Sequence, residues 1–193
     1  MRLPAMRLLA LCQLVVAAAC ALNITAAAAG EPVLDKSSLF ERATQRLSTT
    51  WNEGQTELYL PLHAHHFRSA YSRERINGFN ENALGIGIGR GSYDRDGDWH
   101  GLYAMGFRDS HFQPQYMAGY GYKTYWNPGS DFKVGLGYTL FLTTRADIGH
   151  YTPIPGLLPI ASLEYRKVAL DATYVPGSKG VGNILFFWGK YHF

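Results

Sequence analysis

The sequence predicts an all-β fold, an eight-stranded antiparallel transmembrane β-barrel preceded by an N-terminal amphipathic α-helix. Eight stretches in the second part of the chain alternate between large apolar and small or polar residues, and several have the length of about ten residues that crosses a membrane at a tilt. The last stretch ends at an aromatic residue, Phe193, as is typical of outer-membrane barrels. After the N-terminal segment, no stretch is long and apolar enough for a membrane helix.

The composition agrees with a membrane-embedded sheet. Among the 193 residues, 17% are charged, which is low for a soluble protein, and 14% are aromatic, with 21 glycines and 13 tyrosines. The formal net charge of +3 falls to +1 without Arg2 and Arg7, which lie in the segment that we expect to be removed. We therefore expect no nucleic-acid partner, and the sequence contains no phosphate-binding loop.

Residues 1–29 are predicted to be a secretory signal peptide. Two arginines precede an apolar run of 15 residues from Leu8 to Leu22, which is too short to span a bilayer, and residues 27–29 offer a small-residue cleavage site. Cleavage there removes both cysteines, so the mature protein has no disulfide. Lipoprotein processing at Cys20 is the alternative, but the usual leucine three residues before it is missing.

Residues 30–56 are predicted to form a linker and an amphipathic helix. Ser38 and Glu41 have the spacing of a capping box. Two interpretations are open, a helix packed on its own domain and a helix lying in the membrane interface with Trp51 at the headgroup level. Both depend on one apolar face with residues spaced three and four apart, which consists of Phe40, Ala43, Leu47 and Trp51.

Residues 57–193 are predicted to be the barrel domain. Turn sequences rich in Asp, Asn, Pro and Gly separate the strands at residues 94–98, 127–130 and 176–180. The expected strands are residues 57–71, 83–93, 101–109, 116–126, 132–145, 157–164, 168–174 and 184–193.

Glycines occupy one face of several strands. Gly85, Gly87 and Gly89 alternate with large apolar residues in the second strand, and the fourth and fifth strands repeat the pattern. Glycine inside a strand needs a reason, which here is either room in the lumen or curvature of the sheet. Because an eight-stranded barrel has no water channel, we expect a lumen lined by glycine and apolar residues that holds a hydrocarbon chain.

Five stretches resemble the lipid A palmitoyltransferase (PagP) family of outer-membrane acyltransferases. The resemblance extends roughly from the helix to Phe193. It implies the barrel and helix described above, no cofactor, and the transfer of a palmitoyl chain from the sn-1 position of a phospholipid to the hydroxyacyl chain on the proximal glucosamine of lipid A. The stretches are residues 98–110 (DWHGLYAMGFRDS), 118–122 (AGYGY), 135–139 (GLGYT), 153–159 (PIPGLLP) and 174–177 (YVPG).

The resemblance places the catalytic residues at His66, Asp109 and Ser110. Acyl transfer needs a base for the acceptor hydroxyl, which a histidine provides near neutral pH, and donors for the developing oxyanion. Asp109 could orient the imidazole, and Ser110 could act as nucleophile or oxyanion donor. Neighbouring strand residues point to opposite faces, so both reach the site only if the chain leaves the strand there. From the residues alone, this pair is equally an ordinary turn, and His66 an ordinary surface or core histidine.

The resemblance also assigns residues that handle the lipid. Gly121 falls on the acyl-chain ruler, where glycine is similar to the form that selects a sixteen-carbon chain. Pro61 and Pro176 match prolines at lateral gaps between strands, where a residue without an N–H weakens the ladder. Ala83 stands where the family has a third proline. The segment around His63 also departs from the family pattern.

The remaining polar residues give weaker signals. His63 and His65 share a strand face and could ligate a metal, but no third or fourth ligand is evident in the sequence, so we expect no metal site. Arg145, Asp147 and His150 lie in a predicted loop, where they either contact lipid A phosphates or form ordinary solvated charge.

Together these features predict a protein of the Gram-negative outer membrane, surrounded by its lipids, that acts as a monomer or weak homodimer. We expect a phospholipid donor and lipid A or lipopolysaccharide as the acceptor. A second class of protein, a non-enzymatic lipid-binding or adhesion barrel, predicts bound lipid without turnover. A third, a soluble exported barrel that binds an apolar ligand, predicts solubility without detergent, which strands apolar on both faces disfavour.

Overall fold

The computed structural model describes residues 36–126 and 131–193. The chain divides into two compact units, residues 1–44 and residues 45–193. The predicted signal peptide and the linker up to residue 35 lie outside the described residues. Within the described ranges, no helix is long and apolar enough to cross a membrane.

Helix α2 (Lys36–Glu53) confirms the predicted N-terminal helix. It begins two residues before Ser38, so the capping prediction at Ser38 is wrong, because this residue lies inside the helix and not at its start. In the second unit, the Leu47 and Trp51 side chains are 39% and 65% exposed. Because a helix packed on a core would bury such residues, their exposure favours the interfacial interpretation.

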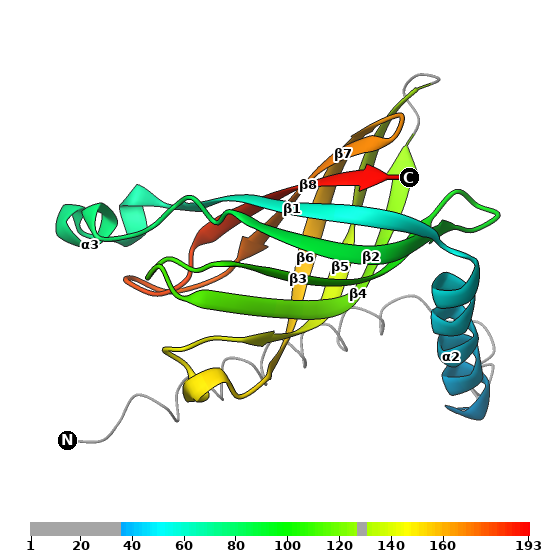
Figure 1. Ribbon diagram of the computed structural model, residues 1–193, viewed down its shortest axis with the longest axis horizontal. Helices are drawn as coiled ribbons and strands as arrows, with labels where there is room; N and C mark the ends of the chain where they lie inside the picture. The colour runs from blue at the N-terminus through cyan, green and yellow to red at the C-terminus, as the bar shows by residue number, and fades with distance from the viewer. Residues whose placement is uncertain (1–35, 127–130) are drawn as a thin grey trace, which may run out of the picture. The chain divides into compact units, whose positions relative to one another are not determined.

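Eight antiparallel strands form a closed barrel in which every strand pairs with its neighbours in sequence (Figure 1), and this confirms the predicted fold class. Pairing between the first and last strands closes the sheet, so every strand has a neighbouring strand on both sides. The strands are β1 (Gln55–His66), β2 (Gly85–Tyr93), β3 (Trp99–Arg108), β4 (Pro114–Trp126), β5 (Phe132–Thr144), β6 (Ile154–Tyr165), β7 (Val168–Val175) and β8 (Ile184–His192).

The first strand is shorter than predicted. The sequence predicts a strand up to residue 71, but β1 ends at His66 and is followed by a 3-10 turn (Arg68–Ala70) and helix α3 (Arg73–Asn77). The hydroxyl of Ser72 accepts the backbone N–H of Arg75 at 3.4 Å and caps α3. This local hydrogen bond offers the backbone an alternative to the strand ladder.

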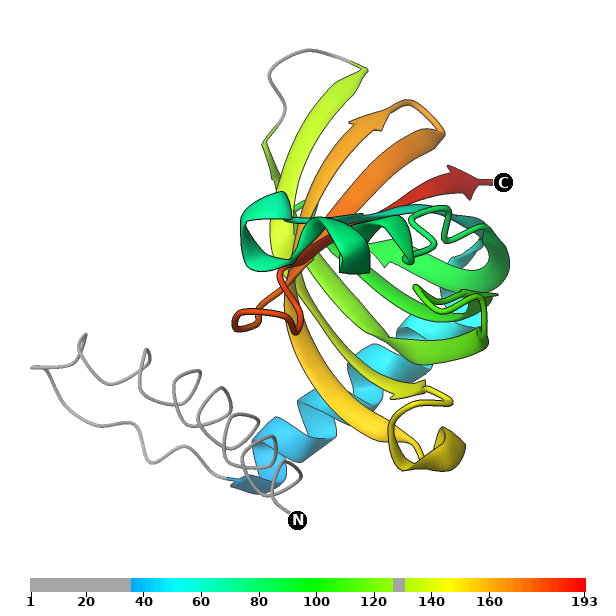
Figure 2. The ribbon, with the colours of Figure 1, turned by 90° about the vertical axis from the view of Figure 1, so that its left-hand side faces the viewer.

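The two ends of the barrel differ. At one end, which we call the short-turn end, residues 94–98 and 166–167 connect strands, and the C-terminus lies here. At the other, the long-loop end, residues 67–84, 109–113, 145–153 and 176–183 connect them. Figure 1 shows α3 at the end away from the C-terminus, and Figure 2 looks onto that end. Short turns face the periplasm in outer-membrane barrels, and longer loops face outward.

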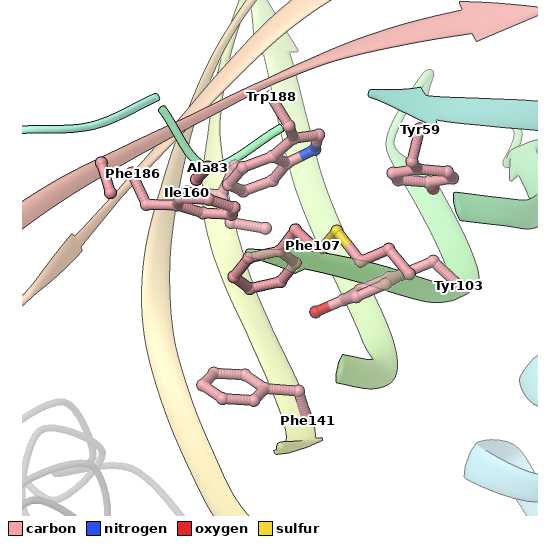
Figure 3. Close-up of a cluster of buried hydrophobic side chains, with 10 residues drawn as sticks. Tyr59, Ala83, Tyr103, Phe107, Phe141, Ile160, Phe186 and Trp188 are labelled. Atoms are coloured by element: carbon pink, nitrogen blue, oxygen red, sulfur yellow. The ribbon is translucent and has the colours of Figure 1, made fainter. Parts of the chain in front are cut away.

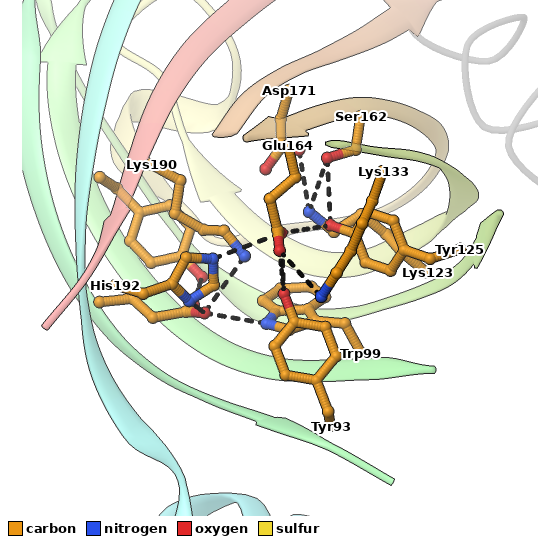
Figure 4. Close-up of polar contacts among 12 residues, drawn as sticks. Tyr93, Trp99, Lys123, Tyr125, Lys133, Ser162, Glu164, Asp171, Lys190 and His192 are labelled. Atoms are coloured by element: carbon orange, nitrogen blue, oxygen red, sulfur yellow. Dashed lines mark hydrogen bonds and ion pairs between the residues drawn. The ribbon is translucent and has the colours of Figure 1, made fainter. Parts of the chain in front are cut away.

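The lumen has an apolar part and an ionic part. Its apolar part is a cluster of inward side chains that point toward one another (Figure 3): Tyr59, Tyr103, Met105, Phe107, Phe141, Ile160, Phe186 and Trp188. Toward the short-turn end, an ionic cluster follows (Figure 4): Glu57, Lys123, Glu164, Asp171, Lys190 and His192. The prediction of a lumen lined by glycine and apolar residues is therefore correct for one part only.

The glycine face turns toward the lumen, and curvature explains much of it. A Cβ atom at Gly85 would collide with the carbonyl oxygen of Gly106 on β3, and one at Gly137 with that of Tyr122 on β4. Glycine is required at these positions because the neighbouring backbone approaches closely. These two glycines therefore serve the tight curvature of the barrel and leave no empty space in the lumen.

Candidate active site

An irregularity in β1 turns His66 inward. The register against β8 shifts between Pro61 and His63, so that a residue is inserted without a partner. Before the shift, odd-numbered residues such as Tyr59 are buried, and after it Ala64 and His66 are buried. The bulge thus exchanges the two faces of the strand and places the His66 imidazole, 1% exposed, inside the long-loop end.

The catalytic residues predicted on β3 lie just beyond the strand. β3 ends at Arg108, and the chain then turns, with the Phe112 N–H donating to the Asp109 carbonyl at 3.2 Å. Phe112 adopts a positive φ of 62° within this turn. Because Asp109 and Ser110 belong to a turn, the opposite-face rule for strands does not apply to them.

Ser110 and His66 are directly hydrogen-bonded. The Ser110 Oγ lies 2.9 Å from the His66 Nε2. The imidazole also stacks on Phe79 with ring centroids 4.4 Å apart, and Tyr71 packs edge-on at 5.6 Å. These aromatic contacts hold the ring in the orientation that presents Nε2 to the serine.

A carboxylate that no sequence pattern marks completes the chain of hydrogen bonds. Glu81, in the loop before β2, places Oε1 3.3 Å from the His66 Nδ1 and accepts the His66 backbone N–H at 2.9 Å. Arg68 donates to both Glu81 oxygens, at 2.9 and 2.7 Å. A proton held on Nδ1 by Glu81 leaves Nε2 free to accept from the Ser110 hydroxyl.

Glu81 carries a negative charge over the whole range of growth pH. Burial alone raises its pKa, but the hydrogen bonds from the Arg68 guanidinium and the His66 backbone outweigh this effect and lower the pKa to about 2. An ionised carboxylate at Nδ1 stabilises an imidazolium when His66 accepts a proton. The only sequence signal for Glu81 was its position just before the second strand, which does not reveal the contact.

Asp109 supports the turn that carries the serine. Its Oδ1 accepts the backbone N–H groups of His111 and Gln113, both at 2.8 Å, and the Asn80 side chain donates to its carbonyl at 3.1 Å. Its Oδ2 is buried without a hydrogen-bond partner among the described residues. The carboxylate bonded to the imidazole is thus Glu81, whereas Asp109 was the residue expected to orient it.

The first predicted proline lies at an interruption of the strand ladder, which we call the first opening. Pairing between β1 and β2 ends at Tyr59 and Gly87, although β1 continues to pair with β8 as far as His66. Pro61 lies in the part of β1 that has no partner on β2. The Ala83 N–H donates to the Glu81 carbonyl at 3.2 Å, within its own loop. The opening is therefore present although a proline is missing at position 83.

A second opening lies between β6 and β7. Their ladder runs from Tyr165 and Val168 only to Ile160 and Thr173, so residues 154–159 of β6 pair with β5 alone. Pro176 follows the end of β7 on this side of the barrel. Both predicted prolines thus lie where the ladder is interrupted near the long-loop end.

Gly121 lies where the apolar and ionic parts of the lumen meet. A Cβ atom at this position would come within 2.8 Å of the Trp99 ring. The buried Trp99 donates its indole N–H to the Glu57 carboxylate at 2.9 Å. The Lys123 and Lys190 ammonium groups lie 4.4 and 3.8 Å from its ring centroid. Trp99 therefore forms the floor of the apolar cluster, and Gly121 leaves space for its ring.

Two other groups of polar residues complete the long-loop end. Arg145 is paired with Asp147 through two hydrogen bonds of 2.9 and 2.8 Å, which agrees with the interpretation as solvated loop charge. Ligand atoms of His63, His65 and Glu81 all lie within 4.8 Å of one another. The structure thus supplies a third potential metal ligand that the sequence did not reveal.

Comparison with known proteins identifies the family. A family model described as "Antimicrobial peptide resistance and lipid A acylation protein PagP" matches residues 46–190. The chain belongs to the PagP family. This membership confirms the resemblance carried by the five sequence stretches, and the matched residues include all eight strands of the PagP barrel except the end of β8.

Individual relatives agree with the PagP assignment. The "Lipid A acyltransferase PagP" of Methylobacillus flagellatus is 48% identical over 156 residues, which cover 81% of this chain and 85% of that protein. The protein of the same name in Bordetella pertussis is 50% identical over 151 residues, covering 78% and 83%. That of Legionella longbeachae is 46% identical over 158 residues, covering 81% and 68%.

Proposed function

We propose that this protein is an outer-membrane acyltransferase that moves a palmitoyl chain from the sn-1 position of a phospholipid to the hydroxyacyl chain on the proximal glucosamine of lipid A. The observation that carries the proposal is the hydrogen-bonded series Ser110–His66–Glu81 beside an apolar lumen with two openings in its wall. The family and its relatives, which are named lipid A acyltransferases, support the same reaction.

The barrel surface supports a membrane location. Outward side chains of β2 and β5 are apolar and strongly exposed, with Ile86 at 65%, Ile88 at 64% and Leu140 at 55%. Such a belt is stable only against lipid. It disfavours a soluble exported barrel. In the proposal, the mature protein functions in the outer membrane as a monomer or weak homodimer after its signal peptide has been removed.

The lumen selects the donor chain by its depth. The acyl chain leaves a bilayer that is as apolar as the lumen, so the hydrophobic effect contributes little to its binding. The fit of the chain to the lumen therefore determines which chain length is selected. We place the sn-1 chain among the apolar cluster, where the flexible side chain of Met105 adapts to it. Its methyl end would stop at Trp99, because below this ring lie buried charges that a longer chain would desolvate.

His66 acts as the general base in this proposal. Its Nε2 accepts a proton from a hydroxyl, and the charge of Glu81 stabilises the imidazolium that forms. In one route, Ser110 Oγ attacks the ester carbonyl, the sn-1 ester bond breaks, and the lysophospholipid leaves with the proton that His66 had taken from Ser110. The lipid A hydroxyl then gives its proton to His66 and takes the chain from the acyl-enzyme, which frees Ser110. In the other, the lipid A hydroxyl attacks directly and gives its proton to Nε2, while the Ser110 hydroxyl turns from Nε2 to the oxyanion. The lysophospholipid then leaves with the proton from His66. The 2.9 Å contact places the Ser110 hydroxyl beside the base that both routes use.

Asp109 has a positioning role in the proposal. By accepting two backbone N–H groups, it fixes the turn that holds Ser110 against the imidazole.

Turnover by the purified protein tests the proposed function. The protein in detergent receives phosphatidylcholine with a labelled sn-1 chain together with lipid A, and mass spectrometry measures acylated lipid A. We expect His66→Asn and Ser110→Ala to lower the rate about 10²- to 10⁴-fold, the range for loss of a general base or its partner. The variants must retain the circular dichroism of the wild-type barrel. Equal rates for wild type and variants would refute the site, and bound lipid without any product would support a non-enzymatic barrel.

A further inference from the structure

We propose that His63, His65 and Glu81 bind a divalent transition-metal ion, and that the bound ion slows the proposed acyl transfer by engaging the carboxylate that orients His66. The first part stands on the geometry alone, whereas the second rests on the proposed function.

The fold brings the three ligands together. The bulge in β1 leaves His63 and His65 on the face opposite to His66, where their rings lie side by side with centroids 6.2 Å apart. Glu81 comes from the loop before β2. This loop bonds to β1 at the long-loop side of the first opening, where the Glu81 carbonyl accepts the Ala64 N–H at 2.8 Å. Ligand atoms of all three lie within 4.8 Å of one another.

The ligand types indicate the class of metal. Two imidazoles and a carboxylate suit Zn²⁺, Ni²⁺ or Cu²⁺, whereas Mg²⁺ and Ca²⁺ prefer sets made only of oxygen atoms. Bonds of about 2.0–2.1 Å bring the ligand atoms around zinc closer together than 4.8 Å, so the side chains must rotate. The His63 and His65 residues are half-buried, and their imidazole rings make no hydrogen bond to a described residue, so the rings are free to rotate. Three protein ligands leave a fourth position for water.

Glu81 connects this cluster to the active site. Its Oε1 faces the His66 Nδ1, and both of its oxygens accept from Arg68. An ion bound by Glu81 competes with these contacts and pulls the carboxylate toward His63 and His65. His66 then loses the partner that orients its ring, although no active-site residue has been altered.

Metal binding and activity are measured on the same protein. The full-length mature barrel, purified in detergent without a polyhistidine tag, is titrated with Zn²⁺ by calorimetry. We expect one bound ion per chain, with affinity at least tenfold weaker in H63N/H65N and in the single variant His65→Asn. His150→Asn is the matched control, because His150 is exposed in another loop outside the cluster, and it should bind zinc like the wild type. Binding by H63N/H65N that equals wild-type binding, or no binding at all by the wild type, would overturn the site.

The link to catalysis has its own readout. Each protein is assayed for acyl transfer with and without saturating Zn²⁺, and the ratio of the two rates is compared. We expect zinc to lower the wild-type and His150→Asn rates at least tenfold and to leave the H63N/H65N ratio near one. Zinc binding without inhibition would overturn the coupling. If the wild-type protein forms no product even without added zinc, the proposed function is refuted. The calorimetric result would still decide the metal site.

Discussion

Replacing Glu81 by glutamine tests the carboxylate that the structure adds to the active site. The substitution keeps the shape of the side chain and removes its charge from beside His66. At the observed 3.3 Å, attraction between the imidazolium and the carboxylate amounts to about 5 kcal/mol with an effective dielectric constant of about 20. The amide oxygen can still accept a hydrogen bond of about 1 kcal/mol. Since solvent screens part of the difference, we expect a loss of about 3–4 kcal/mol.

This loss corresponds to a kcat about 10²- to 10³-fold lower, with little change in KM, because the charge acts mainly when His66 is protonated. The assay measures acylated lipid A formed in detergent at several donor concentrations. Glu74→Gln is the matched control, since Glu74 lies in α3 of the same loop and makes no ion pair with a described residue. A fall of less than threefold for Glu81→Gln, or an equal fall for Glu74→Gln, would refute the role of Glu81.

Three other changes give distinct expected outcomes. The pKa of Glu81 is lowered from 4.5 to about 2 in the folded protein, so its stabilising effect is complete above about pH 4.5 and is lost as the pH falls toward 2. Urea unfolding should show this decline, and Glu81→Gln should weaken it. Gly121→Met places a side chain against Trp99 and should shift the preferred donor to shorter chains, measured with mixed-chain phosphatidylcholines; an unchanged preference would mean that Gly121 is not the ruler. Lys190→Met removes one of the two cations beside the buried Glu57 carboxylate, which keeps His192 and the Trp99 N–H, and should lower the free energy of unfolding by about 1.5–3 kcal/mol. The double variant E57Q/K190M should recover part of this loss.

The fold could be predicted because successive residues of a membrane strand face lipid and lumen in turn, and their side chains differ accordingly. Alternation revealed which side chains face lipid, and the glycine face was correctly expected to turn toward the lumen. The ionic cluster was missed because each member, such as Lys123, Asp171 or Lys190, stands alone among apolar and small neighbours in its own strand. Only closure of the barrel brings Lys123 of β4 to Asp171 of β7 and Lys190 of β8 to Glu57 of β1.

The site could be predicted in part. The resemblance named His66 and Ser110, and the structure brings them within 2.9 Å of each other. Strict alternation from Tyr59 would have turned His65 inward and His66 outward, and no pattern in the sequence marks the bulge that reverses them. The contact between Glu81 and His66 could not be predicted for another reason. Glu81 reaches His66 from a loop whose path depends on tertiary contacts with β1.

The mass of lipid A after incubation with the purified wild-type barrel and a phospholipid donor tests the proposed acyl transfer most directly. We expect lipid A to gain a single acyl chain that comes from the sn-1 position of the donor, and a lysophospholipid to form in equal amount. Lipid A of unchanged mass, in the presence of a folded barrel and a donor with a sixteen-carbon sn-1 chain, would contradict it.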